Sequence, residues 1–168
     1  MTDLPPRNAP FEPTLRAASR PSLGQIGLQQ FAPYLINAVS LSWTTRLAAA
    51  LKAHDLTTPK MRALAILSIT SPITINELSL YALTEQSTMS RTLDALEEQG
   101  FIQRKPRPED LRVRDVHLTE SGRAAFGRVW PEMYDLLLKF FEGVDNEEYN
   151  AFAATLHKVM ANIRRYGA

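Results

Sequence analysis

Apolar residues recur at steps of three and four between residues 28 and 54, which is the spacing of one face of an α-helix. Pro33 lies near the start of this stretch, where a helix tolerates proline. Ile36 and Leu41 widen the apolar stripe, so we expect a long helix that is buried on two sides, by its own chain and by a second chain. The stripe itself consists of Phe31, Leu35, Val39, Trp43, Leu47, Ala50 and Leu51.

Two shorter helices are expected after a break at residues 55–58. The first covers residues 59–69. Thr74 and Glu77 match a capping box, in which an N-terminal hydroxyl and an acid three residues later cap each other's backbone N–H groups. The second helix should therefore start at Thr74 and end near Leu83, whose side chain is expected to point inward.

A third helix of this group is expected over residues 86–99. Thr84 is its expected N-cap, and Gly100 fits the position just past its end. Its buried stripe should consist of Met89, Leu93 and Leu96. The opposite face carries polar side chains, namely Gln86, Ser87, Thr88, Ser90, Arg91 and Asp94.

The period of the pattern changes after Gly100, and two strands are expected. Residues 101–104 and 113–118 are predicted to pair as a hairpin, with a long tip between them. Alternation along the second strand places Val116 on the covered face and Asp115 on the outward face.

Two long helices are expected in the C-terminal part of the chain. The first covers residues 120–142, and Thr119 is its expected N-cap. It contains Pro131, which should kink the helix because proline removes a backbone hydrogen bond. The second, residues 146–166, follows another capping box at residues 145–148. Its apolar stripe consists of Tyr149, Phe152, Leu156, Val159, Met160 and Ile163.

The N-terminal residues 1–27 hold five prolines and little apolar periodicity, which indicates a disordered or extended arm. Its cations Arg7, Arg16 and Arg20 could contact phosphate or a partner subunit. Alternatively, the arm is a solvated tail.

The composition excludes several classes of function. The chain has 168 residues, 45% of them hydrophobic, and no cysteine, so disulfides, thiol redox sensing and cysteine-ligated zinc are excluded. Three histidines lack ligand-like spacing, so we expect no metal and no cofactor. No apolar stretch is long enough for a membrane span, and no signal pattern begins the chain. We therefore expect a soluble cytoplasmic protein without a membrane partner.

Charge and motif spacing narrow the function further. The formal net charge is +1, and residues 57–122 carry eight basic and nine acidic residues, so affinity for a polyanion would have to come from a local patch. There is no Ser/His/Asp spacing, glycine-rich phosphate loop or paired-acid motif. An enzyme is therefore not expected.

The helices predicted over residues 74–83 and 86–99, joined by a short turn, have the spacing of a helix-turn-helix. Arg91 is the one long cation on the polar face of the second helix, and it could reach a guanine or a phosphate. The first exposed turn carries short polar side chains that would let the backbone approach a major groove: Gln86, Ser87, Thr88 and Ser90.

The predicted hairpin concentrates positive charge. It carries five cations against Glu109 and Asp110, a net +3 that favours a polyanion. Asp110 and Arg112 share a face of an extended strand, so the carboxylate could hold the guanidinium in the direction of a narrow minor groove. The five cations are Arg104, Lys105, Arg107, Arg112 and Arg114.

Three segments, residues 85–102, 110–112 and 118–122, resemble motifs of the MarR family of bacterial transcription regulators. The order of elements agrees from about residue 28 to residue 166. The resemblance implies a mostly α, α+β winged helix fold.

In that fold, the winged helix-turn-helix lobe would be residues 57–122, and the dimerisation helices would be residues 28–56 and 123–168. The resemblance further implies a two-fold homodimer on a palindromic double-stranded DNA operator, with recognition helices in successive major grooves about ten base pairs apart or a multiple of that spacing. It places Arg112 in the minor groove.

The same resemblance implies a small aromatic or acidic metabolite that releases the DNA from a site between the dimer helices and the lobe. Arg46 could pair with a carboxylate there; alternatively, the aromatic rings are dimer core and Arg46 is solvated or ion-paired. The absence of cysteine argues against peroxide sensing. The candidate ligand residues are Phe31, Tyr34, Trp43, Arg46, Trp130 and Met133.

The leading interpretation is thus a sequence-specific DNA-binding regulator, with repression as the expected mode. The alternative is a winged helix used only for protein–protein contact. The near-neutral charge of residues 57–122 favours that alternative, and the basic hairpin argues against it.

Overall fold

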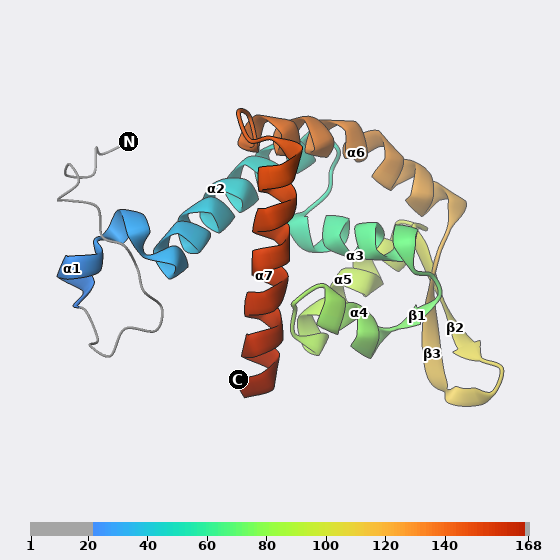
Figure 1. Cartoon of the computed structure of the whole chain (residues 1–168). Helices are drawn as coiled ribbons and strands as arrows, with labels where there is room; N and C mark the ends of the chain where they lie inside the picture. Colours follow the sequence, from blue (N-terminus) through green and yellow to red (C-terminus); the bar gives the residue numbers. More distant parts are fainter. Residues whose placement is uncertain (1–21, 167–168) are drawn as a thin grey trace. The chain divides into compact units, whose positions relative to one another are not determined.

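The computed structural model describes residues 22–166, and the chain divides into two compact units with the boundary between residues 49 and 50. The arginines and prolines of the predicted N-terminal arm lie outside the described residues. The described end of that arm is a short helix, α1 (Leu23–Ile26), followed by a 3₁₀ turn, η1 (Leu28–Gln30). A long helix, α2 (Ala32–Lys52), follows and continues past the boundary (Figure 1).

The helix predicted over residues 28–54 is thus interrupted near its start. Phe31 has extended backbone angles, φ −86° and ψ 96°, and separates η1 from α2. The widened stripe of α2 is exposed, with Leu35 at 42%, Val39 at 54% and Leu41 at 70%. Burial of this stripe by a second chain remains a prediction.

The second unit contains four short elements, a hairpin and two long helices (Figure 1). Its three strands form an antiparallel sheet in the order β1-β3-β2, so β3 is central. The elements are α3 (Thr58–Ile69), β1 (Ile73–Thr74), α4 (Ile75–Tyr81), α5 (Gln86–Glu98), β2 (Ile102–Arg107), β3 (Asp110–Leu118), α6 (Glu120–Phe140) and α7 (Asn146–Tyr166).

The core of this unit lies where α3 contacts α5, α6 and β3. The predicted stripe of α5 is confirmed, since Met89, Leu93 and Leu96 are completely buried. Leu64 of α3 and Val116 of β3 are also completely buried. This packing fixes which face of α5 is left for solvent.

The helix α4 begins with the predicted capping box. The Thr74 hydroxyl accepts a hydrogen bond from the Glu77 N–H at 3.2 Å, and Glu77 Oε2 accepts one from the Thr74 N–H at 2.8 Å. The prediction that Leu83 points inward is wrong: its side chain is 78% exposed. Its φ of +51° places it in the left-handed region, where the turn reverses the chain and directs the side chain outward.

The hairpin is tighter than predicted. The strand β2 continues to Arg107 and β3 begins at Asp110, so only Pro108 and Glu109 lie between them. The residues predicted as turn join β2 because it is an edge strand, where Pro106 needs no partner for its missing N–H. The register in which β2 pairs with β3 shifts between Pro106 and Arg107.

The helix α6 begins at the predicted cap, where the Thr119 hydroxyl accepts a hydrogen bond from the Gly122 N–H at 3.0 Å, and Pro131 lies inside the helix. The predicted cap of α7 is also confirmed, because Asp145 Oδ1 accepts from the Glu148 N–H at 2.9 Å and Glu148 Oε2 accepts from the Asp145 N–H at 3.0 Å. No described residue of α7 is buried, so its apolar stripe lies at the surface of the chain. Within residues 22–166, no helix is long and apolar enough to cross a membrane.

Candidate nucleic-acid interface

The polar face of α5 is presented to solvent because the opposite face anchors the helix in the core. Gln86, Ser87, Thr88 and Arg91 are exposed, and Ser90 is half-buried. The face therefore offers short donors and acceptors in its first turn and one long cation in its second, which is what contact with base edges and phosphates requires.

The start of α5 differs from the prediction. Glu85, not Thr84, occupies the N-cap position, and no side chain caps the helix there. The Thr84 hydroxyl instead donates to the backbone oxygen of Ala82 at 3.1 Å, within the turn. The first backbone N–H groups of α5 thus have no side-chain cap of their own.

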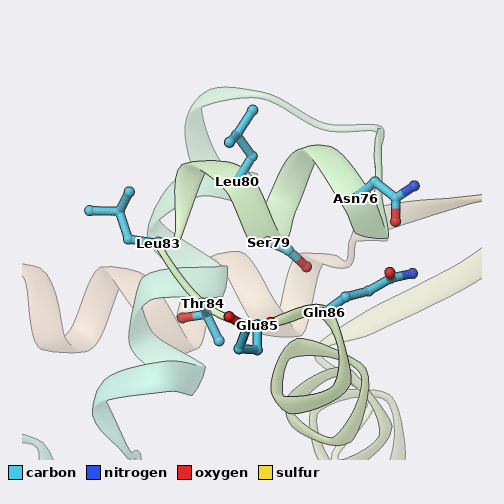
Figure 2. A pocket seen from close by; sticks show the side chains of 7 residues that line it. All are labelled: Asn76, Ser79, Leu80, Leu83, Thr84, Glu85 and Gln86. Atoms are coloured by element: carbon cyan, nitrogen blue, oxygen red, sulfur yellow. The ribbon is translucent and has the colours of Figure 1, made fainter. Parts of the chain in front are cut away.

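An open cleft of about 500 Å³ lies between α4 and α5. In Figure 2, Asn76 of α4 and Gln86 of α5 extend toward the same side, while Leu80 and Leu83 point elsewhere. The sequence interpretation did not include Asn76. Asn76 is exposed in the first turn of α4. Its place inside the capping box formed by Thr74 and Glu77 is the sequence signal that could have identified it. The cleft is lined by Asn76, Ser79, Leu80, Leu83, Thr84, Glu85 and Gln86.

Arg104, predicted as a DNA contact, is held by two acids of α5. Its Nη2 lies 2.6 Å from Glu97 Oε2 and 2.7 Å from Asp94 Oδ1, and its side chain is 20% exposed. The hydrogen bond from Arg104 lowers the pKa of Glu97, and the same bond raises the pKa of Arg104. The structure thus gives Arg104 the role of joining the hairpin to α5.

Arg107 is also paired, which corrects the prediction for Asp115. Arg107 Nη2 donates to Asp115 Oδ1 at 2.7 Å and Nε donates to Oδ2 at 3.0 Å. This bond lowers the pKa of Asp115 and raises that of Arg107. Asp115 was expected on an outward face but is buried. The short strand β1, which the sequence did not predict, makes β3 the central strand of the sheet.

Asp110 and Arg112 interact, but not in the way predicted. Asp110 Oδ1 accepts a hydrogen bond from the backbone N–H of Arg112 at 3.0 Å. The carboxylate therefore fixes the local backbone at the hairpin tip rather than the guanidinium. The side chain of Arg112 is exposed beyond it.

Three of the five predicted hairpin cations, Lys105, Arg112 and Arg114, are exposed. A second open cleft, of about 430 Å³, lies between the hairpin and the first turns of α4 and α5. All the charged residues that line this cleft are basic, and Asn76 and Gln86 are among its uncharged polar residues. The cleft is lined by Thr74, Ile75, Asn76, Gln86, Arg107, Arg112, Val113 and Arg114.

The candidate ligand residues are divided between the two units. Phe31, Tyr34, Trp43 and Arg46 belong to the first unit, the last three on α2, and Trp130 and Met133 belong to the second, on α6. Met133 is buried in the core, whereas Trp130 is 48% exposed.

Trp130 stands in a row of aromatic rings along α6. Its ring centroid lies 5.7 Å from that of Phe126 and 6.0 Å from that of Tyr134. No cluster of three or more metal-ligating side chains occurs in the part of the chain that the structure describes.

These features define a class of protein. A helix-turn-helix with an exposed polar second helix, followed by a basic β-hairpin clamped to that helix, is a winged helix-turn-helix of the DNA-binding kind.

Comparison with known proteins identifies the family. The MarR family profile matches residues 56–113. A MarR family transcriptional regulator from Silicibacter pomeroyi shares 41% sequence identity and a TM-score of 0.79, over 85% of this chain and 97% of that one. The protein therefore belongs to the MarR family of transcriptional regulators, and it is not an enzyme.

Two further relatives bear on its mode of action. The HTH-type transcriptional repressor IacR of Pseudomonas putida is 27% identical over 143 residues, covering 85% of this chain and 86% of the repressor. A cysteine-to-serine mutant of MarR from E. coli, solved in complex with operator DNA, is 26% identical with a TM-score of 0.67, covering 74% of this chain and 90% of that one.

Proposed function

We propose that this protein is a dimeric, sequence-specific repressor that binds a palindromic operator and is released by a small aromatic or acidic metabolite. The observation that supports the DNA-binding part of the proposal is the pair of ion pairs that Arg104 of β2 makes with Asp94 and Glu97 of α5. These ion pairs hold an exposed polar helix face and a basic hairpin in one fixed arrangement. The operator complex of the E. coli relative supports DNA over a purely protein partner.

On DNA, α5 enters the major groove and the hairpin reaches the adjacent minor groove. Gln86, Ser87, Thr88 and Ser90 approach base edges, and Arg91 contacts a guanine or a phosphate. Arg112 enters the minor groove, where a narrow groove concentrates negative potential. Lys105 and Arg114 contact phosphates, whereas Arg104, Arg107 and Asp110 act by holding the hairpin.

The dimer is built from the apolar surfaces that a single chain leaves exposed. On α7, Phe152 is 45%, Val159 41% and Ile163 58% exposed, at the spacing of one helix face. Exposed apolar stripes of this length mark protein interfaces. Two-fold symmetry would then place two α5 helices about one helical turn of DNA apart, or a multiple of it.

The effector is proposed to bind against the aromatic row of α6. The aromatic row on α6 supports a flat apolar ligand, since Trp130 and Tyr134 are 48% and 46% exposed. A protein that acts on chromosomal DNA would work in the cytoplasm.

A gel-shift titration tests the proposal. The wild-type protein is titrated onto duplex DNA from upstream of its own gene, with unrelated DNA of equal length as competitor, at several salt concentrations. We expect a specific complex whose affinity falls steeply with salt because counterions are released from the phosphates. No complex at low salt would refute DNA binding and favour the protein-contact alternative.

A further inference from the structure

Asp115 is a buried carboxylate at the centre of the small sheet. Its Cα pairs with Thr74 of β1 on one side and with Lys105 of β2 on the other, and its side chain is 11% exposed. A carboxylate in such a place is held by its strand and requires a charged or hydrogen-bonding partner. It is therefore a fixed point from which another residue can be positioned.

Arg107 is that partner, and it lies where the hairpin turns. The guanidinium binds both carboxylate oxygens, at 2.7 and 3.0 Å, which sets its direction as well as its distance. The residue stands at the register shift of β2, and its Cα pairs with that of Asp110. The bidentate pair thus ties the irregular part of the hairpin to the middle of the sheet.

The connection continues from Asp110 to the tip. Asp110 Oδ1 accepts the backbone N–H of Arg112 at 3.0 Å. Three successive links therefore lead from the buried Asp115, through Arg107 and Asp110, to the residue proposed to enter the minor groove. Arg107 and Arg112 also line the same cleft as Gln86, the first residue of α5.

We propose that Arg107 and Asp115 are a positioning pair that aligns Arg112 with α5. With this alignment, α5 can contact the major groove and Arg112 the minor groove in the same register of the operator. This inference rests on the proposed DNA-binding function and deepens it. Without the pair, Arg112 would still be present, but its backbone would be less ordered in the free protein. Ordering it on the DNA would then cost binding free energy. Arg107 itself is engaged by Asp115 and does not contact a phosphate.

The test measures the operator affinity of the double variant Arg107→Met/Asp115→Asn in two backgrounds, wild type and Arg112→Ala. This variant removes one positive and one negative charge, so the net charge is unchanged and no buried carboxylate is left unpaired. In the wild-type background we expect operator affinity to fall about two- to tenfold, the cost of ordering one or two long side chains on binding. In the Arg112→Ala background we expect less than about a twofold further loss, because the aligned side chain is already absent.

Lys105→Met is the matched control, since it removes a cation from the same strand but breaks no ion pair in the described structure. It should lower affinity by the same factor in both backgrounds and reduce the slope of log affinity against log salt by about one. The double variant should leave that slope unchanged. Thermal unfolding of each protein gives the folded fraction used in the affinities.

If the double variant fails to fold, Arg107→Lys keeps the inference testable, because lysine retains the positive charge and loses only the bidentate geometry. It should reproduce the loss in the wild-type background and not in the Arg112→Ala background. Equal losses in both backgrounds, or a fall in the salt slope of about one for the double variant, would overturn the inference. Wild-type protein that binds no operator would instead overturn the proposed function itself.

Discussion

Arg104 and Glu97 are joined twice, once through a side chain and once through the backbone. Arg104 Nε donates to Glu97 Oε2 at 2.8 Å, and the Arg104 N–H donates to Glu97 Oε1 at 2.8 Å. The first residue lies on β2 and the second on α5. The Glu97 carboxylate therefore joins both the backbone and the side chain of the hairpin to α5.

This contact predicts an acid-dependent loss of stability. The pKa of Glu97 is lowered by the hydrogen bond from Arg104, so the folded state binds its proton less readily than the unfolded state. The contribution to stability is fully present above the ordinary glutamate pKa of about 4.3 and is lost as pH falls through the lowered value. Glu97→Gln should therefore destabilise the protein at pH 7 and show a smaller difference from wild type at about pH 3.

Urea unfolding at a series of pH values measures this effect. Glu98→Gln is the control, because Glu98 is the exposed neighbour and forms no ion pair among the described residues. Its unfolding free energy should follow that of wild type at every pH. A Glu97→Gln deficit that persisted undiminished in acid would contradict the assignment.

The cations of the interface should separate by role in operator titrations. Arg112→Ala should weaken binding about tenfold or more, and it should lower the salt slope by about one if the guanidinium displaces counterions in the groove. Arg91→Ala should weaken all operators alike if Arg91 contacts a phosphate, and relax the preference at one base pair if it contacts a guanine.

Arg128→Ala removes the same charge from an exposed position on α6 and serves as the control for both variants. Its operator affinity should stay within about twofold of wild type at fixed salt, since distant surface charges are screened. If Arg112→Ala and Arg91→Ala behaved like this control, the groove assignments would be wrong.

The junction between the hairpin and α6 depends on a glycine. A Cβ added at Gly122 would lie 2.1 Å from the backbone oxygen of Phe101, which cannot move without disturbing the start of β2. Gly122→Ala should destabilise the protein by about 1–3 kcal/mol or more, measured by chemical denaturation. Gly127→Ala, on the same helix with open space around it, should instead stabilise by about 0.5–1 kcal/mol. Equal effects of the two variants would argue against the close approach at Gly122.

The stripe of α7 should control assembly. Ile163 is 58% exposed in the single chain, and a carboxylate there would be buried without a partner in the proposed dimer. Ile163→Glu should therefore shift the protein from dimer to monomer in sedimentation equilibrium. Ala154→Glu adds the same charge on the opposite face of α7 and should leave the dimer intact. A dimeric Ile163→Glu variant would move the interface elsewhere.

Several features follow from the sequence alone because their causes are local. The stripe of Met89, Leu93 and Leu96 is a matter of helical period, and the caps at Thr74 and Thr119 join residues three apart. These interactions form between neighbours along the chain, so spacing and residue type suffice to predict them.

Tertiary structure decided which hairpin cations are exposed and which are held in ion pairs. Arg104 and Arg107 are the same residue type as Arg112 and lie within the same short segment, so composition could not distinguish them. Only folding brings Glu97 of α5 against Arg104 of β2. Only folding also brings Asp115 against Arg107, on a strand that the two-residue β1 makes central. An ion pair depends on which elements meet in space, and that information is not contained in local periodicity.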